Sequence, residues 1–232
     1  MRAQLYKFGY EIEGEFSSQL LSRLEKLGVM KTDGSIHQCG NHNSYLELGE
    51  FNSKPAQLNP HGRVKTKKLF EMLQREYKRE KLHFNDSMGF HVHLSFKPTY
   101  PVELFSHEFV KYFLGKLKRE YPDVWEDRAT NKFCRVNIKE ADITYGHDRY
   151  KAINLYPSFV THKTIEFRIF PADTPEKMYE YLFFVIKSTK AFLRSDFSMK
   201  KELNLRENPQ EVDINYEAIA PNRIEPVVEY NY

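Results

Sequence analysis

Hydrophobic and polar positions along the chain follow two different periods, and each period predicts one kind of element. Alternation at every second residue is typical of half-buried strands, and apolar residues three or four positions apart are typical of amphipathic helices. The first pattern predicts strands at 5–15, 45–51, 90–96, 150–156 and 164–170. The second predicts helices at 17–27, about 64–80, 105–119 and about 173–193.

The segments between these elements predict the organisation of the chain. Residues 29–44 hold Gly, Asn and His and predict a loop, while residues 120–148 are irregular with room for one short element. Mixed strands and helices without an internal repeat predict one domain over residues 1–198. Residues 199–232 are more polar, and we expect a C-terminal arm or extension that either wraps the domain or contacts a partner.

Three of the predicted strands have one apolar side and one ionisable side. Residues i and i+2 of a strand point to the same face, and their neighbours point to the other. The ionisable pairs are Glu11 and Glu13 in the first strand, His91 and His93 in the second, and Glu166 and Arg168 in the third. The apolar partners on the opposite faces include Tyr10, Ile12, Phe90, Val92, Ile165 and Phe167.

Two interpretations of these pairs are open. Any one strand alone is typical of an antiparallel sheet whose polar face meets water. Solvated strand faces, however, usually mix Thr, Lys, Ser and Gln with the charges, whereas these pairs contain only Glu, His and Arg. Several carboxylates on one sheet face repel one another and lose solvation, so bound cations would resolve the conflict. Carboxylates with one or two imidazoles form an oxygen-rich ligand set that favours Mg²⁺ or Mn²⁺.

Composition narrows the class of protein. Of the 232 residues, 41% are hydrophobic and 15% aromatic, which predicts a packed core. The net charge of +3 is spread along the chain and does not favour a nucleic-acid partner. Two cysteines are too few for a disulfide framework and suit a reducing compartment. The chain start lacks the apolar stretch of a signal peptide and no later segment is apolar enough to cross a bilayer, so we expect a cytoplasmic protein without membrane contact.

The ordered set of motifs resembles the amidoligases, a branch of the glutamine synthetase-like carboxylate-amine ligase superfamily. The resemblance covers roughly residues 6–190. Each motif alone is weak evidence for the family, whereas the order in which the motifs follow one another is specific. The matching pieces are FGYEIE at 8–13, DGSI at 33–36, EFNS at 50–53, GFHVH at 89–93, RATNKFC at 128–134, RYKAIN at 149–154 and TIEFR at 164–168. The resemblance implies an α+β, glutamine synthetase-like fold, in which a curved, mainly antiparallel sheet is covered by helices on one face.

The resemblance also implies roles for individual residues. ATP and Mg²⁺, or Mn²⁺, would be the cofactors. The implied metal ligands are Glu11, Glu13, Glu50, His91 and Glu166. The implied nucleotide or substrate contacts are His93, Arg168, Asp33, Ser35, Arg149 and Asn154, with Arg168, Glu166 and Arg149 as the catalytic set.

Two departures from the family pattern affect the second acidic strand. Family members commonly place Pro directly after the Ser of this strand, but here Lys54 precedes Pro55. Glu47 also lies close to Glu50, so the sequence leaves open which of the two is the ligand.

The resulting hypothesis is an ATP-dependent ligase that forms an amide or isopeptide bond through an acyl phosphate. Its carboxylate and amine substrates are small molecules, peptides or protein side chains, and the sequence does not specify them, nor the oligomeric state. A metal-dependent nuclease or phosphohydrolase would need a similar ligand set. A non-catalytic nucleic-acid-binding protein is a further alternative, and it would tolerate loss of the acids. The Asp33-Gly34-Ser35 segment is equally compatible with a simple turn.

Overall fold

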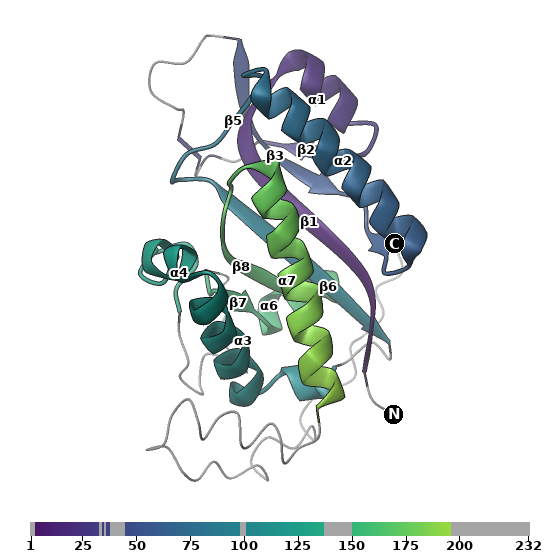
Figure 1. Ribbon diagram of the computed structural model, residues 1–232, viewed down its shortest axis with the longest axis vertical. Coiled ribbons are helices and arrows are strands. Elements are labelled where there is room, and N and C mark those ends of the chain that lie inside the picture. The colour runs from purple at the N-terminus through teal and green to yellow at the C-terminus, as the bar shows by residue number, and fades with distance from the viewer. Residues whose placement is uncertain are drawn as a thin grey trace.

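The computed structural model describes residues 3–32, 34, 36–37, 45–97, 101–136 and 150–195. These residues form a mixed α+β structure around one open sheet in the order β2-β3-β1-β6-β8-β7, with β4 and β5 also paired to β1. Every pair of named strands is antiparallel (Figure 1). The predicted α+β class and mainly antiparallel sheet are therefore confirmed.

Strand β1 is the centre of the sheet because it is long enough to pair with four other strands. The strands are β1 (Gln4–Ser17), β2 (Gly28–Lys31), β3 (Leu46–Ser53), β4 (Ala56–Gln57), β5 (Leu82–His83), β6 (Gly89–Lys97), β7 (Ile153–Asn154) and β8 (Ile165–Pro171). Strands β3 and β6 flank β1, and β8 lies beyond β6. The three strands with ionisable pairs are thus direct neighbours.

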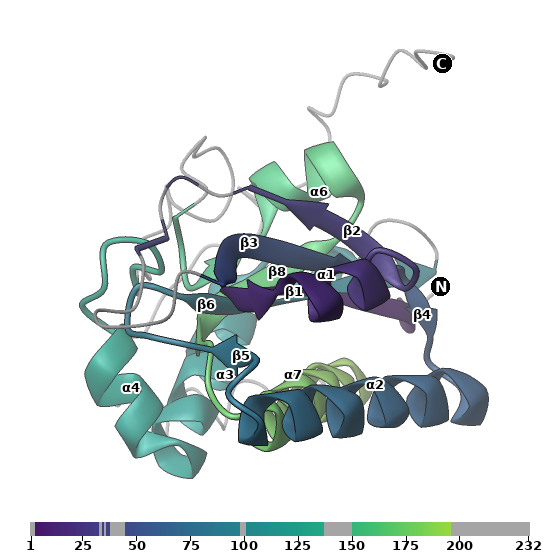
Figure 2. The ribbon, with the colours of Figure 1, turned by 90° about the horizontal axis from the view of Figure 1, so that it is seen from above.

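Helices cover mainly one face of the sheet. They are α1 (Ser18–Leu24), α2 (Pro60–Lys78), α3 (His107–Glu120), α4 (Pro122–Arg128), α6 (Tyr156–His162) and α7 (Pro175–Arg194), with a short 3-10 turn at Val102–Leu104. Figure 2 shows α2, α3 and α7 below the sheet and α6 above it, so the expectation of helices on a single face holds for the three longest helices and not for α6.

The core fills the space between the sheet and the long helices. Tyr10 of β1 contacts Phe70 of α2, with ring centroids 5.2 Å apart, and Phe113 of α3 contacts Phe167 of β8 at 4.7 Å. Helix α7 begins as its sequence predicts, because the Thr174 side chain accepts a hydrogen bond from the Lys177 N–H. The apolar sides of the strands therefore face the helices, and the ionisable sides face away from them.

Two local predictions are wrong, and two features were not expected. Strand β2 extends into the segment expected to be a loop, because Gly28 allows the chain to pack closely on β3, where an added Cβ would come within 2.2 Å of the Asn52 carbonyl oxygen. The strand expected at 150–156 shrinks to β7, and α6 begins at Tyr156, where the next residue is a proline suited to a first turn. Strand β5 and the first turn of α2 were not expected.

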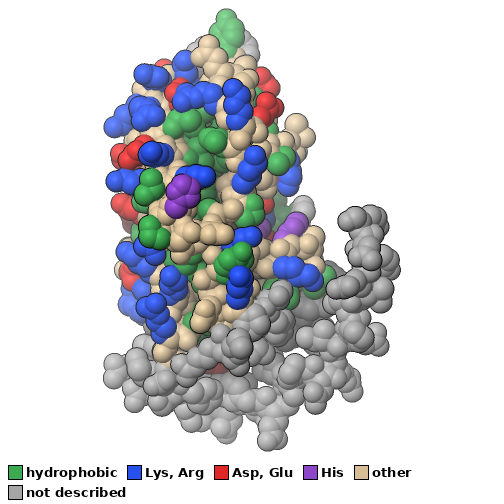
Figure 3. Space-filling model, turned by 90° about the vertical axis from the view of Figure 1, so that its right-hand side faces the viewer, with side chains coloured by type: hydrophobic (Ala, Val, Ile, Leu, Met, Phe, Trp, Pro, Cys, Tyr) green, Lys and Arg blue, Asp and Glu red, His purple; other side chains and the backbone are tan. Residues whose placement is uncertain are grey.

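Basic side chains do not form one block on the face shown in Figure 3, where Lys and Arg are spread among hydrophobic and other side chains. The predicted arm at 199–232 lies outside the described residues. Within the described part of the chain, no helix combines the length and apolar character needed to cross a bilayer.

Candidate metal centre

The ionisable side chains of β1, β3, β6 and β8 meet on the face of the sheet opposite the core. Strand register explains this, because Glu11 pairs with His91, His93 with Glu166, and Glu13 with Glu50. Cross-strand partners on one face have side chains in contact range. The i, i+2 alternation within each strand and the pairing between strands therefore assemble the cluster without any loop.

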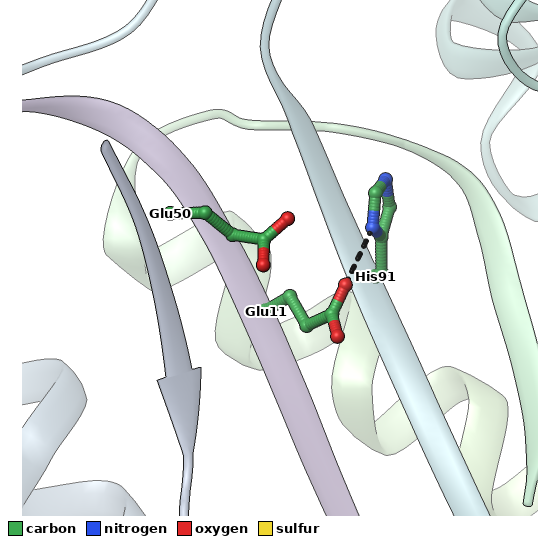
Figure 4. A group of neighbouring side chains, drawn as sticks. All are labelled: Glu11, Glu50 and His91. Carbon is green, nitrogen blue, oxygen red and sulfur yellow. Dashed lines mark hydrogen bonds and ion pairs between the residues drawn. The ribbon is translucent and has the colours of Figure 1, made fainter. Parts of the chain in front are cut away.

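A first group of ligand atoms comes from Glu11, Glu50 and His91 (Figure 4). One ligand atom from each residue lies within 4.8 Å of the others. The Nδ1 atom of His91 lies 3.0 Å from Glu11 Oε2. Asn52 holds the third member, because its side-chain amide donates to Glu50 Oε1 at 2.5 Å.

A second group comes from Glu11, His93 and Glu166, and one ligand atom from each of these residues also lies within 4.8 Å of the others. The Nε2 atom of His93 lies 3.2 Å from Glu11 Oε1 and 3.9 Å from Glu166 Oε1. Glu11 thus belongs to both groups and offers one oxygen to His91 and the other to His93. A carboxylate in this position can bridge two neighbouring cations.

Hydroxyl groups behind His93 fix which of its nitrogens faces the cluster. Its Nδ1 lies 3.1 Å from Thr164 Oγ1, which in turn lies 3.0 Å from Ser158 Oγ. If Nδ1 carries the proton and donates to Thr164, the Nε2 lone pair points to Glu11 and Glu166. Partners of this kind orient the histidine ligands of metal sites.

Glu13 lies beside the two groups and not within them. Its Oε2 accepts a hydrogen bond of 2.5 Å from the Gly89 N–H, and its Oε1 is 3.7 Å from His91 Nε2. Glu13 therefore lies on the Nε2 side of the His91 ring, and Glu11 lies on the Nδ1 side. Gly89 is required here, because an added Cβ would lie 2.7 Å from His91 Nε2.

Both oxygens of Glu166 already have donors. The Arg168 Nη1 donates to Oε1 at 2.7 Å, and the Asn154 amide donates to Oε2 at 2.8 Å. Arg168 also lies 3.4 Å from His91 Nδ1, so its guanidinium stands among the ligand atoms of both groups. Asn154 was expected to contact nucleotide or substrate, but its amide points to Glu166 in the structure.

The charges of the cluster are incompletely balanced. Burial by itself would raise the pKa of Glu11, but hydrogen bonds and charge from His91 and His93 lower it well below its usual range. Burial opposes ionisation of Glu166 too, yet Arg168 and then His93 and His91 lower its pKa. Glu50 behaves differently, because burial and the Glu11 charge raise its pKa. A cation at the first group would remove this repulsion.

The same acids favour the protonated form of His93 over the neutral form. Burial alone would lower its pKa, but the hydrogen bond to Glu11 and the charge of Glu166 outweigh burial and raise it. Arg168 has a raised pKa despite its burial, because Glu166 stabilises its charge. Cation binding would therefore compete with a proton on His93.

The choice between the two acids of β3 follows from their faces. Glu47 is exposed, accepts a hydrogen bond from Ser18 Oγ at 3.1 Å and pairs with Phe16, which belongs to the core face. Glu50 points to the cluster face. Asp33, Ser35 and Arg149 lie outside the described residues, so their expected roles stay predictions.

Sequence reasoning missed two contributors and one further acid on the same strand face. The acid is Glu15, which continues the alternation of Glu11 and Glu13, is fully buried and could have been found by extending the i, i+2 rule by one step. Thr164 and Asn52 have no sequence signal of their own, because their roles depend on which strand lies beside them.

No protein-family model matches the chain, and neither does the sequence of any curated protein.

Proposed function

We propose that this chain is an ATP- and divalent-cation-dependent carboxylate-amine ligase with its reaction centre at the acid and histidine cluster. The observation that carries the proposal is the pair of overlapping ligand groups, Glu11–Glu50–His91 and Glu11–His93–Glu166. Two cations that share one carboxylate are suited to phosphoryl transfer, where charge develops on several oxygens at once.

The donor atoms fit Mg²⁺ or Mn²⁺. Each group offers two carboxylates and one imidazole, which is a hard set without sulfur. The carboxylates of Glu11, Glu13, Glu50 and Glu166 outnumber the single guanidinium of Arg168. Added positive charge would therefore be stabilised in the cluster. Bound cations would neutralise the triphosphate and polarise the γ-phosphoryl group.

The remaining residues position the ligands and the substrate charge. Asn154 and Arg168 hold Glu166, and Glu13 holds His91 from behind. Arg168 stands beside both ligand groups, so phosphate oxygens arriving there would meet a planar fork of donors that matches them. The amidoligase resemblance supports ATP as the nucleotide. It adds Asp33, Ser35 and Arg149 as proposed contacts and a glutamine synthetase-like fold.

In this proposal a substrate carboxylate attacks the γ-phosphorus and forms an acyl phosphate with release of ADP. An amine then displaces phosphate and forms the amide. The protein orients the reactants and keeps water from the acyl phosphate. The carboxylate and the amine belong to small molecules, peptides or protein side chains.

The decisive experiment is incubation of the protein with Mg²⁺, ATP and a pool of amino acids and peptides, followed by mass spectrometry. We expect ADP together with a product lighter than the sum of its substrates by one water. Glu11→Gln should abolish both, and Glu47→Gln, which changes an exposed acid on the other face, should keep both. Release of phosphate without coupling would instead support a metal-dependent phosphohydrolase, and no metal-dependent turnover of any phosphate ester would refute the assignment.

A further inference from the structure

Arg128, the last residue of α4, is a buried cation that has no counter-charge among the residues the structure describes. The residue is 3% exposed, and no carboxylate of the described residues lies within ion-pair distance of its guanidinium. Its Nε atom is buried without a hydrogen-bond partner, and Nη1 reaches the Asp86 carbonyl oxygen at 3.5 Å, the limit of a hydrogen bond. Arg168, by contrast, is bonded to Glu166 at 2.7 Å.

This arrangement is unfavourable in the absence of an anion. Arginine does not lose its proton in proteins, so burial cannot be relieved by neutralisation. Removing the charge from water without a partner leaves a large desolvation cost. The Cys134 thiol is near enough for Arg128 to act on it, but burial raises the pKa of this thiol and keeps it neutral. The thiol therefore supplies no compensating charge.

The environment of Arg128 borders the acid and histidine cluster. Nη1 points to the turn that precedes β6, and the Gly89 N–H at the start of this strand donates to Glu13. On the other side, the Phe133 carbonyl oxygen lies 3.5 Å from Arg168 Nε, and both arginines act on the neighbouring Cys134 thiol. The two guanidinium groups thus flank the same short segment of chain.

We propose that Arg128 binds an oxyanion of a substrate, a carboxylate or a phosphate, beside the cluster. The Asp86 carbonyl oxygen lies near Nη1, while Nε, on the edge formed by Nε and Nη2, has no hydrogen-bond partner among the described residues. This edge presents two parallel N–H donors that match two oxygens of one anion. Nε is itself covered, so binding requires a local movement that opens this edge.

The proposal rests on the ligase function only for the identity of the anion. A ligase of this type handles two anions, the nucleotide phosphates and the carboxylate that becomes acylated. Arg168 borders the ligand groups and suits the first, and Arg128 adds a second cationic group for the other anion. The chemistry of an oxyanion is common to both, so the probes must separate them.

The test compares Arg128→Met, Arg128→Lys and the wild type by thermal unfolding without added metal. Inorganic phosphate and succinate are the two probes, with sodium chloride at matched ionic strength as the salt control. Arg75→Met, which removes an exposed arginine from α2, is the matched variant. We expect one probe to raise the wild-type Tm by about 5–10 °C when its concentration is about 100-fold above its Kd. A phosphate response identifies a phosphate site, and a succinate response identifies a carboxylate site.

Arg128→Met should lose this shift, Arg128→Lys should keep only part of it, and Arg75→Met should keep all of it. Without any probe, Arg128→Met should unfold at the wild-type Tm or above, because it removes an uncompensated buried charge. If Arg128 had only a structural role, Arg128→Met would instead lower the Tm. The proposal is overturned if neither probe stabilises the wild type, or if Arg128→Met responds to the probe as the wild type does. Mn²⁺ binding, titrated on the same proteins, tests the ligase proposal separately and should be unchanged in Arg128→Met.

Discussion

Replacing Glu11 by Gln should affect both ligand groups, whereas replacing Glu50 by Gln should affect only one. Glu11 is common to the two groups, and Glu50 belongs to the first alone. The two substitutions make the same change of charge and leave the same shape. They differ only in the position of the acid within the cluster.

The two variants should also have opposite effects on the cation-free protein. Glu11 accepts contacts of 3.0 and 3.2 Å from His91 and His93, and loss of its charge should weaken each contact by about 1 kcal/mol. The total of about 2 kcal/mol corresponds to a fall in Tm of roughly 4–8 °C for a chain of this size. Glu50 has a raised pKa because burial and the Glu11 charge disfavour its ionisation. Glu50→Gln should therefore leave the cation-free Tm unchanged or higher.

Calorimetric titration with Mn²⁺ gives the number of bound ions and their affinities. Changes to residues around metal ligands commonly cost about 10–100-fold in affinity, so loss of a ligand itself should cost at least about 100-fold. We expect Glu11→Gln to lose both ions and Glu50→Gln to keep the ion at the second group. Equal loss of ions in the two variants, or a cation-free Glu50→Gln that is less stable than Glu11→Gln, would refute the shared-carboxylate arrangement.

Two further predictions concern the histidines. Gly89→Ala should weaken Mn²⁺ binding about 10-fold or more, because the new Cβ forces His91 away from its position. The control Gly34→Ala, whose Cβ would meet no atom of the described residues within 4 Å, should bind Mn²⁺ as the wild type does in the same titration. The raised pKa of His93 predicts two opposite pH effects above its ordinary value of 6.5. The stability that His93 gives to the cation-free protein is fully present below pH 6.5 and is lost as the pH rises through the raised pKa. The affinity for Mn²⁺ increases over the same pH range, because the proton on His93 is lost. Thermal unfolding at several pH values with and without Mn²⁺ checks this, and an unchanged profile in His93→Gln would contradict it.

Strand alternation was the part of the site that the sequence could predict. Glu11, Glu13, His91, His93 and Glu166 were placed on one face from the i, i+2 rule alone, and the structure brings them together. This works because a side chain in a strand has only two faces to choose from. The face opposite the core is then the only place where these charges can lie.

Contacts that depend on neighbouring strands were not predictable in the same way. The sequence could not separate Glu47 from Glu50, because this requires knowing that Glu50 stands opposite Glu13. It could not show that the pairing of β7 with β8 brings the Asn154 amide to Glu166, and the expected contact of Asn154 with nucleotide or substrate stays a prediction. Strand β2 was missed because its burial comes from a close approach to β3 and not from its own pattern.

The central position of β1 also protects the chain against mispairing. Phe8, Tyr10, Ile12 and Phe16 face the core from this strand, and Glu11, Glu13 and Glu15 face away. A slip of β1 by one residue against its neighbours would exchange the two sets and bring three carboxylates into an apolar interior. The acids therefore act during folding as a check on strand alignment, before any ligand is present. Their replacement by apolar residues would weaken the distinction between the correct pairing and its nearest errors.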